Sequence, residues 1–355
     1  MLLLWYNIHS MQTTAKNEIL SSPSIMAAFM SGFDAVSRHV YLLLFPIAFD
    51  LLLWLGPRLR LSNLIHSILT QLESIPQQDL SPYGSQEEVF EMMRLTREIW
   101  GILAERLNIL SAMRTYPVGI PSIMSGRLPL TSPLGTPSGI ELSLGNFIPI
   151  WILLVAVGLL LGTLYFSLTA QAALTDSRTL SEALKDLPRT YLQVIWLTIF
   201  LAVLLTAIGI PFMILTSIIF LITSSAASWI MIVLAGILLW LLLPIVFSPH
   251  GIFINYLTMF HSFLNGFRLA HSNPSKTSLF ILMAFVISQG MDVLWQTPPE
   301  DSWLSLVGIF GHAFISTGIL AASFIYYKQA EKRLQALMQQ RQAILIQQAA
   351  DNHKT

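Results

Sequence analysis

The chain contains no cysteine, and only 11% of its 355 residues are charged. The lack of cysteine excludes disulfide bonds, thiolate metal sites and cysteine nucleophiles. A soluble domain usually carries about 25% charged residues, so this chain has too few to cover itself with a water-facing surface. Basic and acidic residues number 19 each, which makes the net charge zero and indicates no nucleic-acid partner.

The sequence also lacks any catalytic, cofactor-binding or metal-binding motif that rises above background. His250, His261 and His271 fall within one short stretch, but no carboxylate or cysteine accompanies them as a further metal ligand. We therefore predict no cofactor and no metal site.

Apolar residues, by contrast, make up 54% of the chain. A run of about 20 apolar residues is long enough for a helix to cross a bilayer, and the chain holds about six such runs. We predict an all-α polytopic membrane protein with six transmembrane helices. The predicted spans are Val40–Gly56, Phe147–Leu168, Tyr191–Ile208, Trp229–Phe247, Ser278–Trp295 and Trp303–Tyr327.

The third span is followed by a proline that complicates its end. Gly209-Ile210-Pro211 should bend or end the helix, because proline lacks the amide hydrogen and clashes with the preceding turn. Residues 212–222 then either continue the span or form a re-entrant piece. The predicted parts of the chain are a cytoplasmic tail with an interfacial helix (1–39), the first span (40–56), an extracytoplasmic insertion (57–146), the remaining spans with cytoplasmic elbow helices (147–327) and a cytoplasmic helical tail (328–355).

The basic residues indicate the orientation of these spans. The short loops 223–228 and 296–302 hold no lysine or arginine, whereas 178–189 and 328–341 hold several. Because basic residues accumulate in cytoplasmic loops, we predict both termini in the cytoplasm of a bacterial cell. Residues 251–271 have one apolar and one polar side, which predicts a helix in the inner headgroup layer.

A short amphipathic stretch ending in basic residues precedes three of the spans. These elbows are Gly32–Arg38, Thr179–Arg189 and Gly266–His271. Each leads into a pair of spans, so we predict three repeats of an elbow helix and a hairpin.

The elbow-then-span pattern, with Pro46, Asp50 and Gly56-Pro57 in the first span, resembles a known type of membrane domain. It is similar to the multi-span domain associated with bacterial glycerophosphodiester phosphodiesterases, and to related uncharacterised bacterial membrane proteins. The soluble phosphodiesterase barrel and its metal-binding carboxylates are absent, so the resemblance implies no hydrolase activity. The long insertion after the first span departs from that pattern.

The insertion itself shows two kinds of sequence. Residues 61–72 and 85–110 carry apolar stripes at helical spacing, which predicts a helical pair on the outer face of the bundle or in the outer headgroups. Residues 116–146 contain five prolines and five glycines, so no regular element should persist there. Ile120, Ile123 and Met124 make this stretch too apolar for a solvated linker. It predicts an ordered lid that lies against the outer mouth of the bundle or dips into it.

Four polar residues fall within or near the predicted spans at similar depth, namely Asp50, Gln289, Asp292 and His312. Ionisable groups at membrane depth are costly and indicate a functional site by default. They predict a proton relay or a polar ligand pocket. The alternative, which we favour, is that Asp50 is held by a neighbouring donor or water and His312 by a backbone carbonyl, as polar contacts between helices.

The glycines of two spans carry a further prediction. Gly158 and Gly162 lie four residues apart on the second span, and Gly308, Gly311 and Gly318 lie on the sixth. Such spacing allows a neighbouring backbone to approach closely.

Three functions remain open at this point. We favour a non-enzymatic scaffold, a lipid-interacting factor or an accessory subunit, with membrane lipids and protein partners or further copies of the chain as its contacts. The second is a transporter or flippase-like carrier with an outer-leaflet polar site under the lid. The third is a membrane-embedded enzyme with Asp50 and His312 as its acid–base pair. A polar cavity past the midplane would favour transport, and lipid-filled side grooves would favour the first function.

Overall fold

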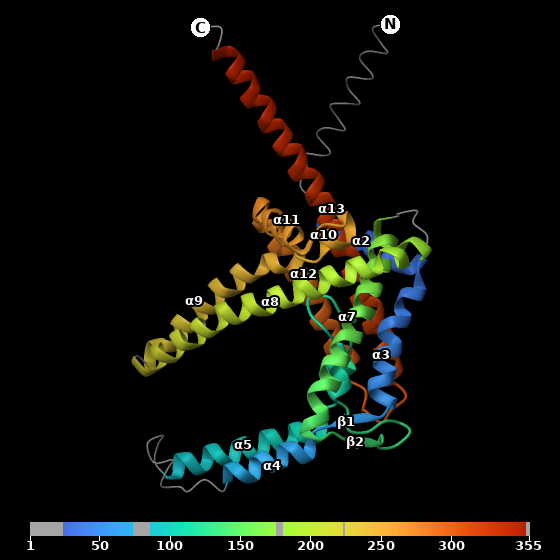
Figure 1. Ribbon diagram of the computed structural model, residues 1–355, viewed down its shortest axis with the longest axis vertical. Helices are drawn as coiled ribbons and strands as arrows, with labels where there is room; N and C mark the ends of the chain where they lie inside the picture. The colour runs from blue at the N-terminus through green and yellow to red at the C-terminus, as the bar shows by residue number, and fades with distance from the viewer. Residues whose placement is uncertain (1–23, 74–85, 175–179, 223, 353–355) are drawn as a thin grey trace. The chain divides into compact units, whose positions relative to one another are not determined.

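A computed structural model describes residues 24–73, 86–174, 180–222 and 224–352. Within these ranges the chain is almost entirely helical, and its only sheet is a pair of three-residue strands. The predicted all-α class agrees with this (Figure 1). In chain order, with η for 3-10 helices, the elements are α2 (Ile25–Arg38), η1 (Val40–Leu43), α3 (Leu44–Leu55), β1 (Arg58–Arg60), α4 (Ser62–Glu73), α5 (Gln86–Arg106), η3 (Ile109–Met113), α6 (Met124–Arg127), β2 (Gly139–Glu141), α7 (Leu144–Leu174), α8 (Leu180–Ile222), α9 (Ser224–Leu242), η4 (Leu243–Phe247), α10 (His250–Asn255), α11 (Met259–Ser272), α12 (Pro274–Trp295) and α13 (Ser305–Asn352).

Among the described residues, four helices are long and apolar enough to cross a membrane. A fifth candidate is formed by Ile25–Arg38 and Val40–Leu55 taken together, but this pair is broken at His39. The chain is therefore a membrane protein by the length and composition of its helices. The four are Leu144–Leu174, Leu184–Ile219, Pro274–Trp295 and Ser305–Ala349.

Helix α8 decides between the two alternatives left open after Pro211 and corrects the predicted elbow. It runs for 43 residues without interruption and contains both Pro188 and Pro211, so the helix does not end at Pro211 and residues 212–222 continue it. A proline removes only one backbone hydrogen bond, and long apolar helices tolerate the loss where neighbours support them. Helix α9 packs alongside α8 (Figure 1). The elbow predicted at Thr179–Arg189 is likewise the beginning of α8 rather than a separate helix in the described part, from Leu180 onward.

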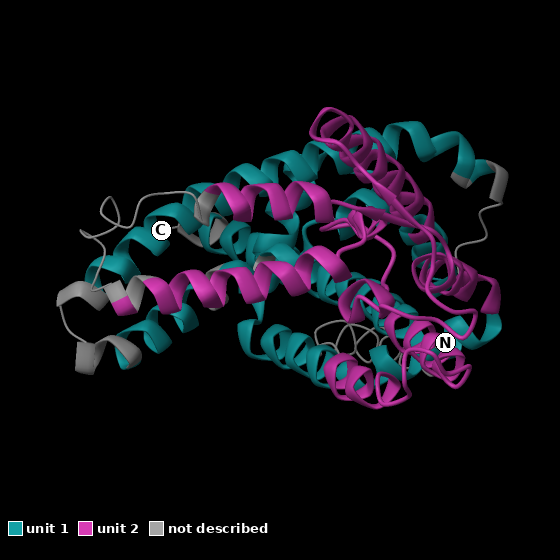
Figure 2. Cartoon of the chain, turned by 90° about the horizontal axis from the view of Figure 1, so that it is seen from below, with its two compact units in different colours: residues 1–39, 166–286, 317–355 teal, residues 40–165, 287–316 magenta. Residues whose placement is uncertain are grey.

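The chain forms two compact units, each made of segments that are distant in sequence (Figure 2). Unit 1 comprises residues 1–39, 166–286 and 317–355, and unit 2 comprises residues 40–165 and 287–316. Helices α7, α12 and α13 contribute residues to both units.

Aromatic rings form the centre of unit 1. The ring centroids of Phe280 and Tyr326 lie 4.4 Å apart, those of Phe29 and Phe280 5.0 Å, and those of Phe247 and Tyr326 5.8 Å, all stacked. Buried stacked rings combine a large apolar area with a favourable ring–ring geometry. They join α2, η4, α12 and the middle of α13.

The stretch predicted as one helix over residues 251–271 is two helices, α10 and α11. The chain turns between them at Tyr256, whose φ of 52° is left-handed. The amide of Leu257 donates to the carbonyl of Gly251 at 3.2 Å, which closes the end of α10 as a C-terminal cap does. The single-helix prediction was wrong because apolar spacing alone does not reveal such a turn.

Unit 2 contains α3, the α4–α5 pair, α7 as far as Tyr165 and the described segments between these helices. Strands β1 and β2 pair in parallel, with Arg58 opposite Gly139 and Arg60 opposite Glu141. The sequence reading placed no strand here. Helices α4 and α5 lie side by side and run crosswise to α3 (Figure 1), and their bounds match the two predicted amphipathic helices within a few residues.

The glycine pair of α7 gives a first prediction. A Cβ atom on Gly158 would lie 2.3 Å from the carbonyl oxygen of Met113, whereas a Cβ atom on Gly145 of the same helix would meet nothing within 4 Å. We expect Gly158→Ala to lower the stability of the protein by about 1–3 kcal/mol, because the backbone around Met113 must move. Gly145→Ala should leave the thermal unfolding midpoint in detergent unchanged or raise it. Equal midpoints for the two variants would contradict the close approach.

Candidate functional site

Residues 109–124 form an inserted segment that lies between α3 and α7 in unit 2. Gly158 leaves room for Met113, and a Cβ on Gly162 would lie 2.8 Å from the Cα of Gly119. Gly162 is 18 residues beyond the first residue of α7, which corresponds to about 27 Å along the helix. The segment thus lies along much of the length of an apolar helix. The backbone that the two glycines admit belongs to this segment and not to another of the long apolar helices.

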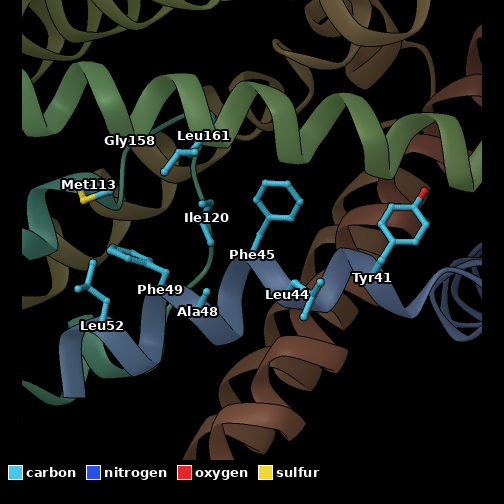
Figure 3. A pocket seen from close by; sticks show the side chains of 10 residues that line it. All are labelled: Tyr41, Leu44, Phe45, Ala48, Phe49, Leu52, Met113, Ile120, Gly158 and Leu161. Atoms are coloured by element: carbon cyan, nitrogen blue, oxygen red, sulfur yellow. The ribbon is translucent and has the colours of Figure 1, made fainter. Parts of the chain in front are cut away.

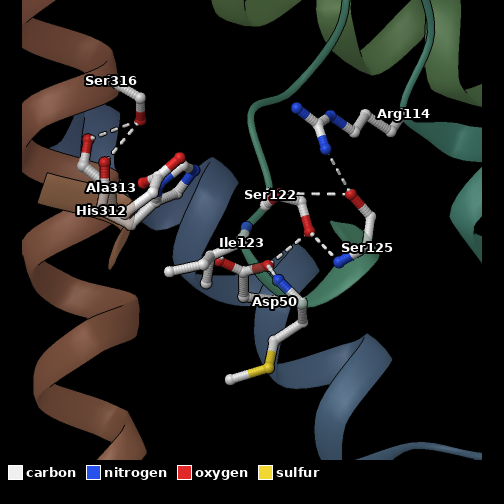
Figure 4. A network of polar contacts seen from close by, with 10 residues as sticks. Asp50, Arg114, Ser122, Ile123, Ser125, His312, Ala313 and Ser316 are labelled. Atoms are coloured by element: carbon white, nitrogen blue, oxygen red, sulfur yellow. Dashed lines mark hydrogen bonds and ion pairs between the residues drawn. The ribbon is translucent and has the colours of Figure 1, made fainter. Parts of the chain in front are cut away.

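Asp50 of α3 holds the end of the inserted segment (Figure 4). Its carboxylate is fully buried and accepts three hydrogen bonds from the segment: from the Ser122 hydroxyl at 2.5 Å and from the amides of Met124 at 3.0 Å and Ile123 at 3.3 Å. The Ser122 hydroxyl in turn accepts from the amide of Ser125 at 3.0 Å. The carboxylate of Asp50 therefore anchors the segment. This agrees with the alternative in which a neighbouring hydrogen-bond donor holds Asp50.

His312 and Asp292 form a second polar contact in unit 2. Nδ1 of His312 donates to Oδ1 of Asp292 at 2.7 Å, so in the neutral ring Nε2 is left as an acceptor. Nε2 is buried and has no hydrogen-bond partner among the described residues. A carboxylate, rather than the predicted backbone carbonyl, thus orients this imidazole.

The four predicted site residues do not assemble into one cluster. Asp292 and His312 are in contact, Asp50 faces the inserted segment, and Gln289 is exposed on α12. His312 is close enough to Asp50 for an electrostatic interaction, but Nε2 makes no hydrogen bond to it. Since Asp50 already accepts three bonds, it is poorly placed to take a proton from a substrate. Within the described ranges, no three His, Asp or Glu side chains are positioned to hold a metal ion.

The structure contains a polar cluster around Glu300 that the sequence did not predict. Its carboxylate accepts from Arg106 at 3.2 Å and from the amide of Leu130 at 2.7 Å. Its carbonyl accepts from the indole of Trp54 at 2.8 Å, and Trp54 packs edge-on against Trp303. The contacts join the end of α3 to the segment before α13.

Arg58 of β1 lies in the same region and is 1% exposed. Burial, together with nearby Arg60 and Arg106, lowers the pKa of its guanidinium from the usual value, and nearby Glu300 raises it. Arginine nevertheless stays protonated in proteins. A positive charge is therefore buried at the end of α3.

An apolar groove runs along α3 (Figure 3). Its volume is about 460 Å³, and it is bounded by α3, α7 and the inserted segment. The tyrosine hydroxyl at one end is the only polar side-chain group that lines it. The lining residues are Tyr41, Leu44, Phe45, Ala48, Phe49, Leu52, Met113, Ile120, Gly158 and Leu161.

The anchoring by Asp50 can be tested with an isosteric change. Asp50→Asn removes the charge and places an NH₂ group among three donors, so we expect a loss of about 1–3 kcal/mol and faster amide hydrogen exchange at residues 118–126. Asp292→Asn serves as the control, because Asp292 bonds to His312 and not to the segment. Hydrogen-exchange mass spectrometry of both variants measures this. Unchanged exchange in Asp50→Asn would contradict the anchor.

Comparisons with known proteins add no assignment to this geometry. No protein-family model, curated protein or solved structure matches the chain. The resemblance to the phosphodiesterase-associated membrane domain remains a prediction.

Proposed function

We propose that this chain is a non-enzymatic membrane protein that binds an acyl chain of a membrane lipid in the groove along α3. The observation that carries the proposal is the lining of the groove, which is apolar over its whole length apart from the hydroxyl of Tyr41. A site for a polar substrate needs several convergent polar groups to fix orientation. An acyl chain needs no polar group to bind.

The dimensions of the groove support the same occupant. It follows η1 and α3 from Tyr41 to Leu52, and this length of 3-10 and α-helix spans about 16–18 Å. The hydrocarbon layer of one leaflet is about 15 Å thick, half of a bilayer core. A single acyl chain aligned with α3 therefore fits the length.

A carrier is the second candidate. The inserted segment supports it, because irregular backbone at membrane depth often lines substrate paths in transporters. The unpartnered Nε2 of His312 would be its polar group. Against it stands Asp50, which is closed off by the segment that it binds.

We also propose six membrane crossings with both termini on the cytoplasmic side. In addition to the four long helices, this assigns one crossing to Val40–Gly56 and one to α9 with η4. The amphipathic helices α2 and α11 precede α3 and α12 as the predicted elbows do. The proposed second repeat is less regular, because α8 has no break before its span.

The orientation gives a direct prediction. An epitope tag after Thr355 should resist protease in sealed right-side-out vesicles and be cleaved after detergent is added, because an even number of crossings returns the chain to the cytoplasmic side. A tag inserted after Pro299 should show the opposite pattern, since the loop 296–302 is proposed to lie outside. A C-terminal tag cleaved in sealed vesicles would rule out this topology.

Lipid binding can be tested by filling the groove. Ala48→Trp places an indole in the middle of the lining, and we expect loss of the lipid that remains bound through purification in mild detergent, measured by native mass spectrometry. Leu153→Trp on α7 is the matched control, since Leu153 is 61% exposed and does not line the groove. Equal lipid retention in both variants would contradict the proposal.

A further inference from the structure

The guanidinium of Arg58 has no hydrogen-bond acceptor in the part of the chain that the structure describes. All three of its nitrogens are buried and lack a partner among the described residues, although the residue is 1% exposed. A buried charge is costly unless it is paired and hydrogen-bonded. Because arginine cannot become neutral by losing its proton, an acceptor outside the described residues must satisfy it.

Two neighbouring side chains have unsatisfied donors as well. Nε of Arg60 is buried without a partner, and so is Nδ2 of Asn108. The Oδ1 of Asn108 accepts from the amides of Leu59 and Leu110 at 3.1 and 3.2 Å, which fixes the side chain beside the Arg58–Leu59 peptide. These residues, Arg58, Arg60 and Asn108, are called the β1 donor cluster below. Every unsatisfied atom in it is a donor, so the missing group is an acceptor.

The charges around the cluster point to an anion. Arg58 interacts electrostatically with Arg60, Arg106 and Glu300. Glu300 is the single acid among them, and its carboxylate is already shared by Arg106 and the amide of Leu130. The carboxylate of Glu141, opposite Arg60 in the strand pair, binds the Ser62 hydroxyl and the Asn63 amide. Positive charge is therefore in excess where the donors gather.

We propose that the β1 donor cluster binds a phosphate group. A guanidinium fork matches phosphate oxygens geometrically, and a tetrahedral oxyanion can accept from several directions at once. The cluster begins three residues after the end of α3, close to where a spanning helix reaches the headgroups. The phosphate comes either from an anionic phospholipid headgroup or from free inorganic phosphate. The proposal does not depend on the acyl-chain groove.

Two cations near Arg58 are partly exposed. Arg60 is partly exposed, and the side chain of Arg106 is 35% exposed. The Arg60 side chain packs against Gly139, and its Nε donates no hydrogen bond to a described residue. An anion that binds this Nε would therefore break no existing hydrogen bond of that atom.

The experiment measures thermal unfolding of the full chain in nonionic detergent. One arm adds inorganic phosphate against chloride at equal ionic strength, and the other adds phosphatidylglycerol against diacylglycerol with the same acyl chains. Stabilisation by inorganic phosphate identifies the free anion, and stabilisation by phosphatidylglycerol alone identifies the lipid headgroup. No stabilisation in either arm overturns the proposal.

Variants connect the response to the cluster. Arg58→Gln should weaken the response at least about thirtyfold in ligand concentration, because it removes the central charge. Arg94→Gln is the matched control, since Arg94 is 58% exposed on α5 and pairs with Glu91, and it should respond as the unmodified chain does. A full response in Arg58→Gln overturns the proposal.

A second variant covers the case in which Arg58→Gln does not fold. Asn108→Asp keeps an oxygen for the two backbone amides and replaces the unsatisfied donor with a carboxylate oxygen. It should unfold at a higher temperature than the unmodified chain without ligand and lose the response to phosphate, because the new charge serves as the acceptor and repels an anion. An undiminished response in Asn108→Asp also overturns the proposal.

Discussion

Backbone groups that leave water must find hydrogen-bond partners, and the arrangement of unit 2 depends on how residues 109–124 meet that requirement. The segment is not a continuous α-helix, so it cannot satisfy its own amides throughout. Asp50 supplies acceptors for two amides and a hydroxyl, and the hydroxyl of Thr115 donates to the carbonyl of Val118 at 2.6 Å. With these groups paired, the apolar side chains of the segment can pack against α3 and α7 and form one wall of the groove.

The parts of the fold that sequence predicts are those with local causes. Apolar length marks α7, α8, α12 and α13 as helices able to cross a membrane, and helical spacing of apolar residues marks α4 and α5. The glycines at 158 and 162 correctly indicated a close approach, because only a missing Cβ permits one. The sequence did not identify the approaching backbone, since that backbone belongs to an irregular segment without a periodic pattern.

The parts that were missed depend on residues far apart in the chain. The pairing of β1 with β2 is a non-local contact between two three-residue strands, too short to leave an alternating pattern. The sequence left open whether residues 212–222 continue the third span, because the local cost of a proline is known while support from α9 is not visible in the sequence. The sequence singled out Asp50, Asp292 and His312, but their hydrogen-bond partners became visible only in the structure. Arg58 was overlooked because it follows the predicted first span rather than lying in it.

The polar side chains of unit 2 differ in how many of their hydrogen-bonding atoms have a partner within the described residues. We use this difference to distinguish side chains with a structural role from those proposed to bind a ligand. Asp50 accepts three bonds from the inserted segment, so its presence is explained by folding alone. His312 has one nitrogen paired and one without a partner in the described structure. Arg58 has three side-chain nitrogens without a partner among the described residues, although a buried cation is the most costly of these groups to leave unsatisfied. A folded chain tolerates such a charge where an acceptor outside the described residues completes it, so the least satisfied residue is the one at which we propose that a ligand binds.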